Sequence, residues 1–212
     1  MTSAFPKSSS GRAKPSPAIS ETQESDTNDK RARILGAAQH LFLRYGVKRT
    51  SIDDVAREAE IAKGTIYLYY ESKNELFAAV AERLCSDILA RARQTLVTKK
   101  GLSERLVDFL DGYIGRLHRL IAQSPHVAEL TESKEALAAT IYANFDFKMK
   151  GLIRTALNEA GITRKGAPDM FLAAALGALR TGDIAEKAYL TRLTALADTL
   201  VLGLRANGSP KE

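Results

Sequence analysis

Apolar side chains recur at helical spacing along most of the chain. In the first such segment they fall on Ile34, Ala37, Ala38, Leu41 and Phe42. Positions three and four apart share one face of an α-helix, so this spacing is typical of an amphipathic helix with one buried side. No segment of the sequence alternates apolar and polar residues over the length of a strand. The pattern therefore predicts an all-α protein.

The breaks in this pattern predict where the helices begin and end. The first helix should end at Tyr45, because Gly46 can adopt the left-handed conformation that follows many helix C-termini. The second should begin at Thr50, the predicted N-cap, with Asp53 as its capping-box partner. A short third helix follows, and Ser72 caps a longer fourth one. Later helices are predicted at residues 102–123, 125–132, 134–160, 168–181 and 185–206, which gives about nine helices in all.

Residues 1–28 are rich in Ser, Pro and Thr and contain few large apolar side chains. Such a segment cannot bury enough surface to offset the entropy of its chain, so we expect a disordered tail. A second short tail is expected at residues 207–212. The basic residues of the first tail leave one alternative open, in which the segment is an arm that reaches into a DNA minor groove.

The stretch "KGTIYLYY", residues 63–70, has the composition of a helix that reads DNA. It follows a short helix after a break of three or four residues, and this is the helix-turn-helix arrangement, whose second helix enters the major groove. Lys63 can reach a phosphate or a guanine edge, and Gly64 has no side chain to hold the helix away from the DNA backbone. Thr65 offers a hydroxyl to phosphate and a methyl to thymine. The phenol of Tyr69 suits a phosphate oxygen.

The same stretch also has a side that faces the core. Ile66 and Tyr70 are four residues apart, so they share one helix face, and we expect both to be buried. Tyr67 and Leu68 should lie on the solvent side. The alternative for the exposed tyrosines is that they are ordinary surface aromatics, but their place beside Lys63 favours contact with DNA.

Charge and composition narrow the class of protein. The 212 residues carry a formal net charge of +6, which favours an anionic partner, either nucleic acid or a membrane surface. The longest apolar run, "MFLAAALGAL", is shorter than the roughly 20 residues that cross a bilayer, and the N-terminal residues lack the apolar core of a signal peptide. We therefore expect a cytoplasmic protein. The single cysteine, Cys85, excludes an intrachain disulfide and is expected to be a small buried side chain.

Catalytic motifs are missing from the sequence. It has no Gly-rich phosphate loop, no HExxH, no nucleophile elbow and no His–Cys constellation, so we expect neither an enzyme nor a cofactor. His126 and Glu129 in "HVAE" have the spacing of half a metal site, but a second pair is missing and we expect no metal. A sequence-blind architectural DNA binder is also disfavoured, because residues 31–73 carry eight basic and five acidic side chains, a net charge of only +3.

The segments "ILGAAQHLFLRYG", "TSIDDVAREA", "KGTIYLYY" and "SKNELF" occur in an order and spacing that resembles the N-terminal domain of the TetR family of bacterial transcriptional regulators. The resemblance covers residues 30 to about 80 closely, and the remainder only in length and helical character. It implies a DNA-binding domain at residues 29–74 with the helix-turn-helix at 51–70, and a larger helical regulatory and dimerisation domain at 75–206. The family's DNA-contact positions fall on Thr50, Lys63, Gly64, Thr65, Tyr67, Leu68, Tyr69 and Lys73.

By the same resemblance, the protein is expected to bind double-stranded operator DNA, most often as a repressor that a small organic effector releases. Three residues depart from the family pattern. Glu60 replaces the common glycine of the turn, which costs about 1 kcal/mol if that position is left-handed. Ala62 replaces a capping Ser or Thr, which forgoes about 1 kcal/mol. Leu68 stands where an aromatic residue is frequent.

The C-terminal part suggests a dimer surface and a pocket. The resemblance implies that the last two helices pair with their copies in a homodimer, as a four-helix bundle. Their apolar residues are Ala173, Ala174, Ala175, Gly177 and Ala178 in one helix, and Leu190, Leu193, Leu196, Ala197, Leu200, Val201 and Leu204 in the other. As a set, the candidate lining of an effector pocket is Phe109, Tyr113, His118, Tyr142, Phe145 and Met149. For any single one of these residues, packing in the core is the alternative.

Overall fold

The computed structural model describes residues 18–180 and 186–206, and every regular element in this part of the chain is a helix. The N-terminal elements are α1 (Ala18–Tyr45), α2 (Ile52–Glu58), α3 (Lys63–Tyr67) and α4 (Lys73–Leu96). After them come α5 (Leu102–Leu110), the π-helical turn η1 (Asp111–Gly115), α6 (Arg116–Ala122), α7 (Val127–Leu137), α8 (Ala139–Glu159), α9 (Ala167–Arg180) and α10 (Glu186–Ala206). Because α5, η1 and α6 follow without a break, the described residues form nine continuous helical segments, and the prediction of an all-α fold with about nine helices is confirmed.

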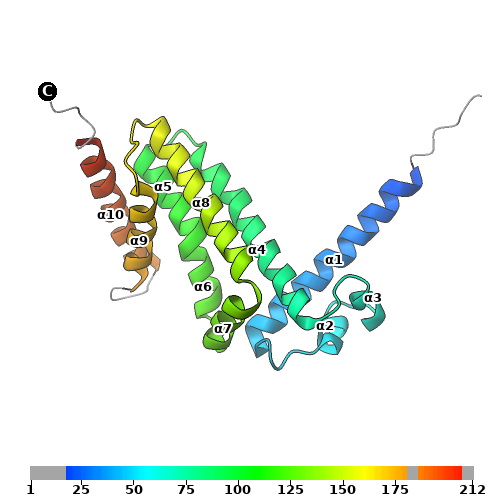
Figure 1. Ribbon diagram of the computed structural model, residues 1–212. Coiled ribbons are helices and arrows are strands. Elements are labelled where there is room, and N and C mark those ends of the chain that lie inside the picture. Colours follow the sequence, from blue (N-terminus) through cyan, green and yellow to red (C-terminus); the bar gives the residue numbers. More distant parts are fainter. Residues whose placement is uncertain (1–17, 181–185, 207–212) are drawn as a thin grey trace, which may run out of the picture.

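The helices form two units that share α4. Figure 1 shows α1, α2 and α3 at one end of the molecule and α9 and α10 at the other. α4 runs between these ends and packs alongside α8. We call the two parts the N-terminal unit and the C-terminal unit. Across residues 18–180 and 186–206, no helix has both the length and the apolar character needed to cross a membrane.

The N-terminal unit has its own core. The predicted apolar face of α1 is buried, from Ile34 at 0% exposed to Phe42 at 2%. Phe42 packs against Phe77 of α4, with 5.7 Å between the ring centres. At α3, Ile66 and Tyr70 are buried, as their spacing predicted. This core holds α3 from behind and so determines which of its sides faces outward.

α4 contributes to two cores. Its first half places Leu76 and Val80 in the core of the N-terminal unit, and its second half places Cys85 and Ile88 in the core of the C-terminal unit. Cys85 is 6% exposed, as predicted, and burial raises the pKa of its thiol to about 12. Because one continuous helix carries residues of both cores, a tilt of α4 in the C-terminal unit also moves the N-terminal unit.

The start of α1 differs from the prediction. The helix begins at Ala18, so residues 18–28 are helical, whereas their composition led us to expect a disordered tail. Positions 18–35 contain no glycine or proline, and Lys30 Nζ pairs with Asp26 Oδ2 at 2.6 Å, one helical turn away. A helix nucleated by the buried residues farther along extends through such a segment at little cost. The rest of the two predicted tails, residues 1–17 and 207–212, lies outside the described residues.

The break between α7 and α8 lies later than predicted. We expected one helix at residues 125–132 and the next at 134–160, but α7 continues to Leu137 and α8 begins at Ala139. The intervening "SKEAL" consists mostly of good helix formers, so nothing in it stops α7. The later break keeps Lys134 on α7, where its carbonyl still accepts a hydrogen bond at 3.0 Å.

Candidate functional site

α2 begins with a complete capping box, one residue later than predicted. Ser51 is the N-cap, and its hydroxyl accepts a hydrogen bond from the N–H of Asp54 at 3.1 Å. The Asp54 carboxylate in turn accepts from the N–H of Ser51 at 3.0 Å. The bonds from the Ser51 hydroxyl and N–H hold the pKa of Asp54 below its usual value. Thr50 and Asp53, which we expected to form the box, lie beside it.

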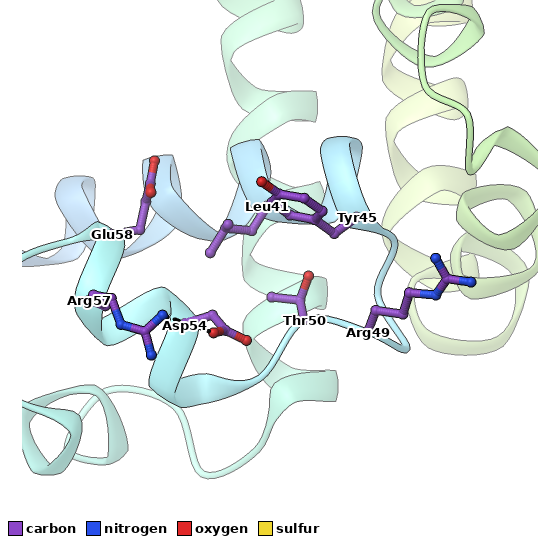
Figure 2. Close-up of a pocket in the computed structure, with 7 residues that line it drawn as sticks. All are labelled: Leu41, Tyr45, Arg49, Thr50, Asp54, Arg57 and Glu58. Carbon is purple, nitrogen blue, oxygen red and sulfur yellow. Dashed lines mark ion pairs between the residues drawn. The ribbon is translucent and has the colours of Figure 1, made fainter.

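Thr50 supports the end of α1 instead of facing outward. Its side chain is 3% exposed, and its hydroxyl donates to the carbonyl of Gly46 at 2.7 Å. Figure 2 shows this side chain at the edge of a groove of about 450 Å³ between α1 and α2, with its hydroxyl turned toward α1. The hydroxyl of Thr50 is therefore buried and already bonded within the protein, and the expected contact of this residue with DNA stays a prediction.

The groove in Figure 2 carries charges of both signs. Arg49 and Arg57 line it together with Asp54 and Glu58, and Arg57 Nη1 lies 3.5 Å from Asp54 Oδ1. The positive and negative charges balance, so the groove has no net attraction for a phosphate. We assign no ligand to it.

The turn between α2 and α3 contains a strained residue, Glu60, whose φ is 52°. This left-handed conformation costs a residue other than glycine about 1 kcal/mol, so the strain expected from the sequence is present. The turn closes with a 3.0 Å hydrogen bond from the N–H of Ile61 to the carbonyl of Ala56. The Arg33 guanidinium of α1 donates to the carbonyls of Ala59 at 2.7 Å and Glu60 at 3.2 Å. α1 therefore helps to fix the angle between α2 and α3, although the turn lacks glycine.

α3 is short and has a narrow exposed face. It begins at Lys63 after Ala62, an N-cap without a side-chain hydrogen bond, as the sequence indicated. Tyr67 is 47% exposed, and Leu68 at the C-cap is 83% exposed. A Cβ added at Gly64 would meet no atom within 4 Å, so the backbone is open to a partner there. We call Lys63, Gly64, Tyr67 and Leu68 the α3 face.

Two further expected contact residues lie at the edge of the α3 face. Thr65 and Tyr69 are half-buried, and Tyr69 packs against the core of the N-terminal unit. Its ring lies 6.4 Å from that of Tyr70, measured between ring centres. These positions are less open than the α3 face itself.

The positive charge of the α3 face has a partner within the protein. Lys63 Nζ lies 2.8 Å from Asp53 Oδ2 of α2, and this hydrogen bond, together with the carboxylate charge, raises the pKa of the lysine. Both side chains are exposed, so such a pair contributes little to stability. A phosphate close to α3 would compete with Asp53 for the ammonium group.

Lys73, at the start of α4, bonds to the protein's own backbone. Its ammonium donates to the carbonyls of Lys48 at 3.2 Å and Thr50 at 3.0 Å. The N-terminus of α4 is capped by Ser72, whose hydroxyl accepts from the N–H of Glu75 at 3.1 Å. Lys73 therefore joins the loop before α2 to α4, and a phosphate would have to displace these bonds to bind it.

The end of α1 is bonded to the start of α7. The N–H of Lys48 donates to Glu129 Oε1 at 2.5 Å, and Lys48 Nζ lies 3.2 Å from Glu132 Oε2. The Ser124 hydroxyl, just before α7, donates to the carbonyl of Leu43 at 2.5 Å. We call these three interactions the α1–α7 contact. Its partners are 81 or 84 positions apart, so no local sequence pattern could have indicated it.

The C-terminal unit contains an open cavity of about 630 Å³, bounded by η1, α6, α7, α8 and α9. Three of the residues that the sequence suggested for a pocket, Tyr113, His118 and Tyr142, line this cavity. Tyr113 and Ile114 belong to the π-helical turn, an irregularity that often occurs at functional sites.

The other three suggested pocket residues are core residues. Phe109 and Met149 are 0% exposed and Phe145 is 4% exposed, and none of them lines the large cavity. The ring of Phe145 meets that of Tyr113 edge-on, with 5.0 Å between ring centres. Phe145 instead lines a separate hollow of about 220 Å³ between α4 and α8. Helical spacing identifies the inward face of a helix but does not separate a filled core from a cavity wall, so a pocket role for these three residues stays a prediction.

A smaller cavity of about 160 Å³ lies where the two units meet, between α1, α4, α6, α7 and α8. Tyr142 packs against both cores, and burial raises the pKa of its phenol to about 12. A molecule in the large cavity would therefore touch side chains that also reach the N-terminal unit. The residues that line both cavities are Leu117, Ile121, Thr131, Lys134 and Tyr142.

α9 and α10 each have an inner and an outer apolar side. The inner side includes Ala175 and Leu193, which are fully buried in the core. The small and leucine residues noted in the sequence are therefore divided between this core and the outside. Exposed large apolar side chains on neighbouring helices are typical of a surface that meets a partner. On the outer side these are Met170, Leu196 and Leu202, whereas the exposed side chain of Leu176 lines the large cavity.

The sequence is similar to those of known transcriptional regulators. The family model described as bacterial regulatory proteins of the tetR family matches residues 34–80. The HTH-type transcriptional repressor SCO4008 of Streptomyces coelicolor is 32% identical over 140 residues, which cover 62% of this chain and 71% of that protein. The HTH-type transcriptional activator FasR of Mycolicibacterium smegmatis is 28% identical over 53% of this chain and 54% of its own length.

Solved structures agree on the fold. GusR of Salmonella enterica matches with a TM-score of 0.58 and 21% identity, over 82% of this chain and 95% of that one. The TetR-family regulator PfmR of Thermus thermophilus matches with a TM-score of 0.56 and 18% identity, over 80% and 97% of the two chains. At these identities the likeness concerns the fold alone, but it extends through the C-terminal unit. Together, the matched helix-turn-helix, the similarity to SCO4008 and the shared fold show that the chain belongs to the TetR family of DNA-binding transcriptional regulators, which is not a family of enzymes.

Proposed function

We propose that this TetR-family regulator is a repressor that binds a two-fold operator as a homodimer and is released by a small organic effector in its C-terminal unit. The domain boundaries that we propose are residues 29–74 for DNA binding and 75–206 for regulation and dimerisation. Its DNA partner would place it in the cytoplasm.

The observation that carries the proposal is the α3 face. Ile66 and Tyr70 anchor α3 from behind, and the opposite side offers a lysine, an open backbone and a phenol. A recognition helix needs this combination, because phosphate contacts position it and side chains at its start meet the base edges. In our proposal Lys63 and Tyr67 contact phosphate or base edges, and Gly64 permits close approach.

The edge and supporting residues have other roles in this proposal. Thr65 and Tyr69 reach phosphates beside the α3 face, and Leu68 meets an apolar thymine methyl. Thr50 and Lys73 act indirectly, because their bonds fix the loop that leads into α2.

A homodimer through α9 and α10 agrees with their outer surface. Met170 is 40% exposed, Leu196 39% and Leu202 68%. Burying such side chains against a second copy removes apolar surface from water and is favourable. Two recognition helices could then meet half-sites about 34 Å apart, one turn of DNA.

The proposed control of DNA binding follows the links between the units. α4 belongs to both cores, and the α1–α7 contact ties the end of α1 to a helix that lines the large cavity. An effector that prefers one arrangement of α4 and α7 would change the separation of the recognition helices. Such coupling typically amounts to about 1–3 kcal/mol and must be reciprocal.

The sign of regulation needs its own test, because SCO4008 is described as a repressor and FasR as an activator. In vitro transcription from a promoter that contains the operator should yield less transcript when the protein is added. More transcript would identify an activator.

The DNA-binding part is tested by fluorescence anisotropy at two salt concentrations. The purified protein is titrated with DNA from upstream of its own gene and with a scrambled duplex of the same composition. We expect a preference of about 10³-fold or more that persists at the higher salt, because base contacts do not release counterions. Equal affinities with a steep salt dependence would contradict sequence-specific binding and favour a sequence-blind architectural role.

A further inference from the structure

Lys134 of α7 stands in the wall that the two cavities share. Its side chain is half-buried, and its ammonium lies 4.6 Å from the centre of the Tyr142 ring. An aromatic face stabilises a nearby cation but does not neutralise it. The position therefore combines a positive charge with reduced access to water.

Lys150, Asp169 and Asp146, which also line the large cavity, each have a partner within the protein. Lys150 Nζ lies 2.6 Å from Asp169 Oδ1, so these two side chains neutralise each other. Asp146 accepts the hydrogen bond of the Tyr113 hydroxyl, and its residue is exposed to solvent. Lys134 differs from them, because no carboxylate among residues 18–180 and 186–206 pairs with it.

Tyr142 supplies a second donor at the same place. No hydrogen bond within the described residues uses its hydroxyl, which is protonated and able to donate at neutral pH. An ammonium and a phenol that both lack an acceptor match an oxyanion, because a carboxylate can accept one hydrogen bond on each oxygen.

The remainder of the cavity suits an apolar molecule. Ile114, Leu117, Leu172, Leu176 and Leu179 line it, and its volume of about 630 Å³ lies within the usual range for small-molecule sites. A bound molecule would extend from the donors at α7 and α8 toward the leucines of α9.

We propose that the effector is an organic acid, whose carboxylate binds the Lys134 ammonium and the Tyr142 hydroxyl and whose apolar body lies along α9. This inference rests on the proposed function, since it names the chemical class of the molecule that the regulator senses. It also suggests how effector binding in the cavity could reach the DNA-binding helices. Lys134 lies on the same helix as Glu129 and Glu132, which hold Lys48 in the α1–α7 contact.

The test compares three probes of equal chain length: decanoate, decan-1-ol and decylammonium. Their affinities for the full-length protein are measured by isothermal titration calorimetry. We expect decanoate to bind at least about tenfold more tightly than the other two, because only decanoate offers an anion to Lys134. Decanoate should also weaken operator binding in the anisotropy assay.

Two lysine variants test whether Lys134 causes the preference for decanoate. Lys134→Met keeps an unbranched side chain as far as Cε and removes the ammonium group. It should weaken decanoate binding at least about tenfold while leaving the affinity for decan-1-ol unchanged. Lys148→Met is the matched control, since Lys148 is exposed on α8 and does not line the large cavity. Thermal unfolding and operator binding without a probe verify that both variants are folded.

Several results would overturn the inference. They are failure of decanoate to bind, equal binding of the three probes, or an unchanged decanoate affinity in Lys134→Met. Preferential binding of decylammonium would also overturn it and would identify Asp146 as the partner of a cationic effector. In each case the wild-type protein would still prefer its operator, whereas failure of the proposed function would appear as a loss of operator preference without any probe.

Discussion

The backbone N–H of Lys48 donates a hydrogen bond to the carboxylate of Glu129, with 2.5 Å between N and Oε1. Lys48 lies in the loop between α1 and α2, and Glu129 lies in the first turn of α7. Only two residues separate Lys48 from Ser51, the N-cap of α2. A displacement of α7 therefore reaches the helix-turn-helix within a few bonds, without passing along the whole of α4.

Replacing Glu129 tests the strength of this link. In Glu129→Ala the N–H of Lys48 loses its acceptor, and we expect the free energy of unfolding to fall by about 1.5–3 kcal/mol, the usual contribution of a hydrogen bond to a charged group. Urea denaturation measures the change. Glu135→Ala, at an exposed position of the same helix, is the control and should change stability by less than about 0.5 kcal/mol. Equal stability of the two variants would mean that the Glu129 bond contributes nothing.

A side chain at Gly46 should destabilise the protein for two separable reasons. Its φ is 83°, and an added Cβ would lie 2.5 Å from Glu129 Oε2. Gly161 has a similar φ of 78° but open space around its Cβ position. Gly161→Ala should therefore cost only the left-handed strain of about 1 kcal/mol, and Gly46→Ala should cost more. Thermal or urea unfolding compares them, and equal losses would show that Glu129 moves aside without cost.

Glu60 has a strained backbone conformation in the turn before α3. A protein with glycine at this position should therefore be more stable than one with another residue. We expect Glu60→Gly to be about 1 kcal/mol more stable than Glu60→Ala, because both variants lack the carboxylate and only the alanine keeps the strain of φ at 52°. The comparison cancels the loss of the exposed contact with Arg33, whose Nη2 lies 3.7 Å from Glu60 Oε2. Urea denaturation measures the free energy of unfolding of the two variants. A more stable alanine variant would contradict a left-handed conformation at position 60.

Cys85 should react slowly in the native protein. Burial raises the pKa of its thiol to about 12, so at pH 8 nearly all of it is protonated, and the thiolate is the reactive form. In the unfolded chain the pKa returns to about 8.5 and the thiolate becomes abundant. Mass spectrometry after treatment with iodoacetamide should show far slower labelling of the native protein than of the urea-unfolded protein. Equal rates would contradict its burial.

Local patterns in the sequence were enough to predict much of the structure of the N-terminal unit. The spacing of Ile66 and Tyr70 identified the buried side of α3, and Gly46 identified the end of α1. The start of α2 was misplaced by one residue. Thr50 and Ser51 are adjacent hydroxyl residues, and each is followed three positions later by an aspartate, so the sequence alone favours neither.

The regulatory features depend on distant contacts and were harder to predict. Phe109 and Tyr113 lie one turn apart on the same inward side, yet one fills the core and the other lines the cavity. Lys134 looked like any lysine of a surface helix, and its importance follows from its neighbour Tyr142 and from the absence of a carboxylate partner among the described residues. Such properties arise only when separate helices are brought together.

The most direct test of the account is the operator affinity of Gly64→Leu, measured by anisotropy. The side chain would enter open space, and leucine favours a helix over glycine by up to about 1 kcal/mol, so the protein should remain folded and no less stable. Gly36→Leu, another helical position with open space, serves as the control. We predict that Gly64→Leu binds the operator at least about tenfold more weakly than the wild type, because the leucine keeps α3 away from the DNA, while the control binds normally. An operator affinity unchanged by Gly64→Leu would contradict the claim that the α3 face enters the DNA groove.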